Sequence, residues 1–190
     1  MQPSCRRFGQ WIAVLAMMTL WPGCTRSLHP LYREADLTFD SQLLGIWAEE
    51  GGKETWTLQK SGAKAYVLTS RDEEKTVKYD AHLLRLGKFV FLDLYPKDAD
   101  EGAAVAAHLF FKVLRTGNTA QVAGLDESWL KKMAADKKLS IAHVLVPAHN
   151  QDSSEESIFL TASTQELQEF VLKYAENTEA FSPTELHRRK

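Results

Sequence analysis

The histidines are the first residues whose side chains could do acid–base chemistry or bind a metal. His82, His108 and His143 fall in stretches expected to be strands, and His149 follows in a polar loop. No two of them have the i, i+4 spacing by which a helix presents paired ligands to zinc, and the chain offers no cysteine ligands beside them. The spacing therefore predicts no metal centre and no cofactor, and we interpret these histidines as core or surface residues.

Sequence motifs of common enzyme classes do not occur in the chain. A Gly-x-Ser-x-Gly nucleophile elbow, a phosphate-cradling glycine loop and a dinucleotide fingerprint are all missing. The acidic runs Glu49–Glu50, 72–74 and Glu155–Glu156 fall in expected turns, where carboxylates are normally solvated. We therefore expect a non-enzymatic protein. A Ser-His-Asp arrangement assembled through space remains an alternative that sequence alone leaves open.

Cys24 is the residue whose chemistry the sequence specifies best. It follows a charged start, Arg6 and Arg7, and a mostly apolar stretch, 11–21, that is too short to span a bilayer. The second of the two cysteines, Cys5, lies within this leader, so an exported chain would keep one thiol without an internal partner. A leader ending in Gly-Cys resembles the signal of bacterial lipoproteins. The resemblance implies that residues 1–23 are removed and that Cys24 carries the lipid.

A lipid on Cys24 would hold the protein at a membrane of the bacterial cell envelope. Thr25, rather than Asp, follows the cysteine, which favours delivery to the outer membrane, facing the periplasm. The alternatives are an ordinary cleaved signal with an incidental cysteine, or an uncleaved anchor.

Charge argues against nucleic acid as a partner. The 190 residues carry a formal net charge of −2, and removal of two arginines with the leader would leave 21 basic and 25 acidic side chains. Phosphate binding needs a concentrated basic face, and the only basic cluster is 188–190 at the C-terminus. We expect these three charges to be solvated. The predicted organisation is a tether over 24–39, a single domain over 40–181 and a flexible tail over 182–190.

The domain is expected to be an antiparallel meander. Strand-like runs alternate with tight turns, several of which contain the glycine that two-residue hairpin loops require. The runs are 45–50, 53–60, 64–70, 75–85, 88–95, 106–116 and 119–124, and strands near 141–146 and 157–161 are expected to complete the sheet. The pattern predicts a mainly β fold that rolls up to hide its edges.

Two helices are expected beside the strands. Asp126 caps a short helix over 127–136, and Ser163 with Glu166 forms a capping box at the start of a C-terminal helix. The C-terminal helix has an apolar stripe of Leu167, Phe170, Val171 and Tyr174. Because the run 88–95 is apolar on both faces, we expect this helix to cover it from outside the sheet.

Gly45-Ile46-Trp47 opens the first strand of the meander after a helical turn that Asp40 caps. Together with the hairpins and the C-terminal helix, this layout resembles the lipocalin or calycin family. The resemblance implies an eight-stranded up-and-down barrel in which Trp47 closes one end and Gly45 permits close approach. In that family an arginine near the C-terminus packs on the tryptophan, and the stretch between Arg115 and Arg188 contains no arginine for that role.

A barrel of this size holds either packed side chains or one small ligand. The residues that could line a pocket, or simply fill it, are Trp56, Tyr66, Tyr79, Phe89 and Phe91, with Trp129 as a lid or a core anchor. The hypothesis is a lipid-anchored, non-enzymatic envelope protein whose barrel binds or shields a small apolar ligand. The alternative is a solid-core module that binds an unidentified protein partner in envelope assembly or stability.

Overall fold

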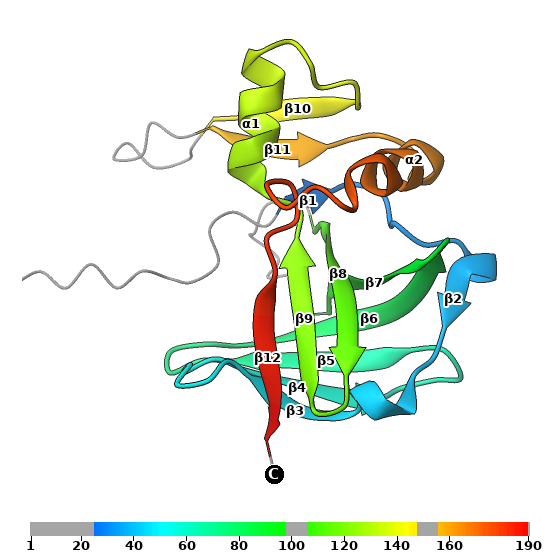
Figure 1. The fold of residues 1–190 in the computed structure, drawn as a ribbon, viewed down its shortest axis with the longest axis vertical. Coiled ribbons are helices and arrows are strands. Elements are labelled where there is room, and N and C mark those ends of the chain that lie inside the picture. Colours follow the sequence, from blue (N-terminus) through cyan, green and yellow to red (C-terminus); the bar gives the residue numbers. More distant parts are fainter. Residues whose placement is uncertain (1–24, 98–105, 148–155, 190) are drawn as a thin grey trace, which may run out of the picture.

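The computed structural model describes residues 25–97, 106–147 and 156–189, which form a mainly β domain with two α-helices (Figure 1). The predicted leader and Cys24 lie outside the described residues. Antiparallel strands close into a barrel in the order β3-β4-β5-β6-β7-β8-β9-β12, and β12 pairs with β3. They are β3 (Gly45–Ala48), β4 (Thr55–Lys60), β5 (Tyr66–Arg71), β6 (Thr76–Leu86), β7 (Phe89–Pro96), β8 (His108–Thr116), β9 (Thr119–Gly124) and β12 (Thr184–Arg189). The lipocalin-like barrel fold predicted from the sequence is confirmed.

Tight glycine turns connect strands of the barrel as predicted. The turns 86–89 and 116–119 each have two residues between paired strand ends. Gly87 and Gly117 have φ angles of 56° and 61°, which a residue with a Cβ adopts only at a cost. Turns this short fix the antiparallel register of β6 with β7 and of β8 with β9.

The barrel is closed by residues that the sequence analysis assigned to a flexible tail, 182–190. β12 pairs with β9 on one side and with β3 on the other. Leu186 is buried among the side chains of the barrel interior. The prediction of a tail was wrong because charged residues surround Leu186 and hide a strand whose backbone is hydrogen-bonded along both edges.

The two later strands exist, but they lie outside the barrel. β10 (His143–Val146) and β11 (Ser157–Leu160) pair with each other, and β1 (Arg26–Ser27) joins β11 to the first residues of β8. β8 pairs with β9 only from Phe111 onward, so its first residues are left to β1. The expectation that these strands complete the sheet is confirmed, and they extend it outside the closed barrel.

Residues 25–39, expected to be a tether, are an ordered strap on the domain. After β1 the strap forms the 3-10 turn η1 (Glu34–Asp36) and β2 (Leu37–Thr38), which pairs with β6. Leu31 is fully buried, and its backbone amide donates to the Asp93 carboxylate at 2.8 Å. These contacts, spread along the strap, fix it to the barrel.

Two α-helices lie on the outside of the barrel (Figure 1). The Asp126 side chain caps the N-terminus of α1 (Glu127–Ala135), and the reciprocal capping box of Ser163 and Glu166 caps that of α2 (Thr164–Tyr174). The outer cluster consists of the buried residues Leu31, Leu37, Leu84, Leu86, Phe91, Phe110, Ala123, Leu125, Trp129, Leu130, Ile141, Ile158, Leu160, Ala162, Leu167, Phe170, Val171, Ala175, Ala180 and Phe181. Because α2 shares this cluster with Phe91 of β7, its predicted place outside the sheet is confirmed.

A second group of side chains fills the barrel interior. The inner cluster consists of Leu43, Trp47, Trp56, Leu58, Tyr66, Leu68, Ala81, Leu83, Leu92, Leu94, Phe111, Val113, Ala120, Val122 and Leu186. No residue of α1 or α2 belongs to it. The β strands therefore separate two cores, one inside the barrel and one beneath the helices.

Candidate functional site

The aromatic residues proposed to line a pocket lie in two different cores. Trp56 and Tyr66 are buried in the inner cluster, and Tyr79 packs against it. Phe91 and Trp129 belong to the outer cluster, with Phe89 packed against that cluster. Phe89 and Phe91, which were expected to line or fill the barrel interior, lie on the outer side of β7 instead. β7 is apolar on both faces, so its sequence does not reveal which alternate residues, Val90, Leu92 and Leu94, face the interior.

The interior is occupied by tightly packed side chains. Trp56 and Phe111 meet edge to face with ring centroids 5.2 Å apart, and Tyr66 is 0% exposed. Near the β3–β4 hairpin, a hollow beside Trp47, Trp56 and Leu186 measures only about 40 Å³. Small-molecule sites usually measure about 300–1,000 Å³, so this hollow does not accept a ligand.

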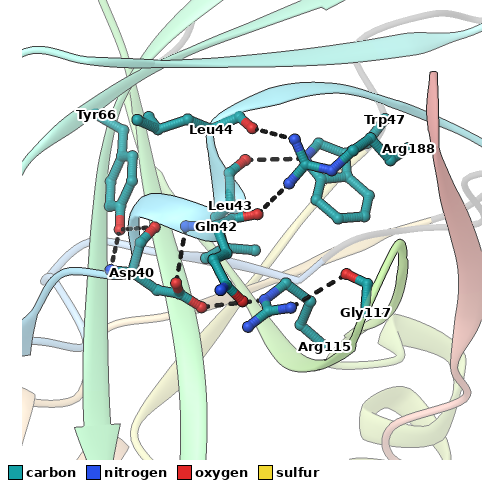
Figure 2. A network of polar contacts seen from close by, with 9 residues as sticks. All are labelled: Asp40, Gln42, Leu43, Leu44, Trp47, Tyr66, Arg115, Gly117 and Arg188. Carbon is teal, nitrogen blue, oxygen red and sulfur yellow. Dashed lines mark hydrogen bonds and ion pairs between the residues drawn. The ribbon is translucent and has the colours of Figure 1, made fainter. Parts of the chain in front are cut away.

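The 3-10 turn η2 (Ser41–Leu43) precedes β3 and places Leu43 in the inner cluster, and Figure 2 shows the polar contacts that hold this turn. The Asp40 carboxylate caps the turn by accepting a hydrogen bond from the backbone amide of Gln42 at 2.9 Å. The Tyr66 hydroxyl binds the backbone of Asp40: it accepts from the Asp40 amide at 2.7 Å and donates to the Asp40 carbonyl at 3.1 Å. Burial raises the pKa of Tyr66 to about 12.

Arg188 of β12 fastens η2 to the first barrel strand (Figure 2). Its guanidinium lies over the Trp47 ring, 4.6 Å from the ring centroid, and donates to the carbonyls of Leu44, at 2.7 Å, and Gln42. The Trp47 indole N–H donates to the Leu43 carbonyl at 2.8 Å. The guanidinium and the indole thus bind three successive carbonyls at the η2 turn.

Sequence reasoning missed Arg188 because it lay in the predicted tail. The sequence between Arg115 and Arg188 contains no arginine that could pack on Trp47, whereas Arg188 itself does so. Alternation could have identified it, since Leu186 and Arg188 fall two apart on one strand face. Gly45 has a φ of 127°, and a Cβ there would lie 2.7 Å from the Arg188 Nη1 atom.

Beside η2 the wall of the barrel opens. β7 and β8 pair only from Phe91 to Leu94 on β7, so Phe89 and Val90 have no partner on β8. At this point there is a cleft of about 780 Å³. Its lining consists of Thr38, Phe39, Asp40, Ser41, Gln42, Leu43, Leu83, Arg85, Lys88, Phe89, Val90, Lys112, Val113, Leu114 and Arg115. The volume is in the range of small-molecule sites, which makes this cleft the candidate binding site.

The cleft combines apolar walls with positive charge. Its lining includes four cationic side chains, Arg85, Lys88, Lys112 and Arg115, and one carboxylate, that of Asp40. Inner-cluster residues Leu43, Leu83 and Val113 reach the cleft and form its apolar part. The arrangement can hold an apolar group against the barrel wall with polar groups at the rim.

The outward face of the sheet carries a buried Asp–His pair. The Asp93 carboxylate, 0% exposed, lies 2.7 Å from His108 Nδ1 and also accepts the Leu31 amide. The rings of Tyr95 and His108 lie 4.7 Å apart. Because the pair is bonded to the strap backbone, its evident role is to fix the strap.

Within residues 25–97, 106–147 and 156–189, no group of three or more His, Cys, Asp or Glu side chains could hold a metal ion. No helix in these ranges is long and apolar enough to cross a bilayer. Comparison of the chain with family models, with curated proteins and with solved structures gave no significant match in any of the three.

Proposed function

We propose that this chain is a lipid-anchored, non-enzymatic protein of the bacterial cell envelope, at the outer membrane facing the periplasm, and that its barrel binds a small apolar ligand. The Gly23-Cys24 leader supports the anchor, and the cleft supports the binding. The inner cluster fills the barrel, so the ligand is assigned to the cleft between β7 and β8 rather than to the barrel centre.

The single observation that carries the binding proposal is the separation of β7 from β8. Val90 and Val113 stand on either side of the gap, and both face the side of the sheet on which the inner cluster lies. Burying apolar area there releases water from both surfaces, at roughly 25 cal/mol per Å². An apolar molecule seated between these strands would complete a wall that the chain leaves open.

Binding is tested with the mature chain, residues 24–190 with Cys24→Ser, which contains every residue that the structure describes. Native mass spectrometry should detect co-purifying lipid, and added apolar ligand should raise the unfolding temperature. Val90→Trp narrows the cleft and should reduce both effects. A bare protein mass together with an unchanged unfolding temperature would contradict the proposal.

The anchor is tested in cells with the full chain. The wild-type protein should sediment with membranes and carry acyl mass on Cys24, whereas Cys24→Ser should appear in the aqueous fraction. Outer and inner membranes are then separated on a density gradient to examine the proposed sorting. Wild-type protein without acyl mass would contradict lipidation.

A solid-core interaction module is the second candidate function. It is favoured by the filled interior and by β10, whose residues Val144, Leu145 and Val146 are 46%, 46% and 44% exposed. β10 pairs with β11 on one side only among the described residues, and apolar edge strands are sites for pairing with other chains. This candidate predicts that crosslinking in cells captures a partner through β10, and that Val90→Trp leaves the capture unchanged.

A further inference from the structure

Arg85 lies on the face of β6 that carries inner-cluster residues, at a position where its side chain is exposed. Residues Ala81 and Leu83, which precede it at intervals of two, belong to the inner cluster, and Tyr79 packs against that cluster. Since strand residues two apart share a face, Arg85 continues this row at the end of the barrel, where the row meets the cleft. A guanidinium therefore stands where an apolar wall reaches solvent.

The other three cations of the cleft already have partners. Arg115 Nε donates to the Asp40 carboxylate at 3.1 Å. Lys88 pairs with the Glu176 carboxylate, and Lys112 Nζ donates to the Ala175 carbonyl at 2.6 Å. Each of these three cations thus already binds an oxygen of the protein.

Arg85, by contrast, has no hydrogen-bond or ion-pair partner for its side chain among residues 25–97, 106–147 and 156–189. A guanidinium presents a planar fork of donors that matches a carboxylate with two parallel hydrogen bonds. The apolar wall beside it begins at Leu83 and continues across the gap at Val90 and Val113. Charge and shape together fit a molecule with one anionic end and one apolar body.

We propose that the cleft between β7 and β8 binds a single-chain amphiphile with a carboxylate head, that Arg85 binds the head, and that the alkyl chain lies against Leu83, Val90 and Val113. This rests on the proposed function, because it specifies the ligand of the same cleft. Arg85 is then the residue that determines the preference for an acid over a neutral apolar molecule.

The test compares two probes, 11-(dansylamino)undecanoic acid and its methyl ester, which share the alkyl chain and the dansyl group and differ in the charge of the head and one methyl group. Fluorescence titrations use the mature chain, residues 24–190 with Cys24→Ser, at neutral pH and low salt. The variants are Arg85→Gln, Arg85→Lys and the matched control Arg71→Gln. Arg71 is exposed at the end of β5, opposite Thr76 in the strand register, so it lies at the other end of β6 from Arg85. Circular dichroism and unfolding temperature establish that each variant is folded.

We expect the acid to bind about tenfold more tightly than the ester, as hydrogen bonds to a charged group allow. Arg85→Gln should remove this preference, Arg85→Lys should keep part of it, and Arg71→Gln should leave it unchanged. Added salt should weaken binding of the acid and not of the ester.

Other results overturn the inference. Equal binding of acid and ester, or a preference that survives Arg85→Gln, excludes Arg85 as the head-group site while leaving apolar ligand binding in place. If Arg71→Gln also lost the preference for the acid, the preference would come from the overall charge of the protein, and the inference would be overturned in the same way. Binding of neither probe would overturn the proposed function as well.

Discussion

The guanidinium of Arg188 lies over the indole of Trp47, 4.6 Å from the ring centroid, although 140 residues separate the two in the chain. The contact joins the first barrel strand to the last and holds the η2 turn. Its effects on stability can be measured.

Arg188→Ala should destabilise the fold by about 2 kcal/mol, because it removes charge-assisted hydrogen bonds to two carbonyls and the contact with Trp47. Urea unfolding followed by Trp fluorescence measures the change. Arg188→Lys keeps the charge without the planar fork and should give an intermediate loss. An unfolding free energy equal to that of the wild type would mean that the turn is held without Arg188.

Gly45→Ala should cost about 1–3 kcal/mol, because φ at this position is 127° and the new Cβ would displace the Arg188 guanidinium. A double-mutant cycle with Arg188→Ala separates the two causes. In the Arg188→Ala background the displacement no longer matters, so the remaining cost of Gly45→Ala is the backbone strain. Strict additivity would show that Gly45 and Arg188 act independently.

Alkaline pH should weaken the fold through Tyr66. Burial raises the pKa of its hydroxyl from 10.0 to about 12, so the folded protein holds this proton more tightly than the unfolded chain does. The raised pKa of Tyr66 adds on the order of 2–3 kcal/mol to the free energy of unfolding. This stabilisation is fully present below pH 10 and is lost as the pH rises towards 12. Urea unfolding measures the free energy of unfolding of the wild type and of Tyr66→Phe at each pH. The difference between the two isolates Tyr66, because the lysines titrate in both proteins. A difference that stays constant with pH would contradict the assignment.

Asp93→Ala should destabilise the protein by about 2–4 kcal/mol, because the Leu31 amide and His108 Nδ1 would both lose their acceptor in a buried place. Hydrogen exchange at Leu31 should accelerate more than exchange in β4 or β5. Asp80→Ala is the control, since its exposed pair with Lys97 contributes about 0–1 kcal/mol. Unchanged exchange at Leu31 would show that other contacts hold the strap.

The meander and both helices could be predicted from the sequence because their signals are local. Alternation in β4 to β6, glycine turns and the Ser163 capping box each lie within a few residues. The strands from β3 to β9 accordingly lie close to the predicted ranges. The position of α2 followed from the two apolar faces of β7, which require a second cover.

The rest depends on pairing between distant segments, which local patterns do not encode. β12 has one apolar residue at its centre, Leu186, and becomes a strand because β3 and β9 each present an open edge. The cleft arises where β7 and β8 stop pairing, and no residue type signals that point. Arg85 could be recognised as a charge on the inner face of β6. Whether its side chain has a hydrogen-bond or ion-pair partner depends on which residues the fold places beside it.

β12 follows all the other described elements in the chain, yet its partner β3 is the first strand of the barrel. A chain synthesised from its amino end therefore leaves one edge of β3 unpaired until β12 has emerged. Closure of the barrel waits for β12, and a ribosome that still holds residues 184–189 would keep the barrel open.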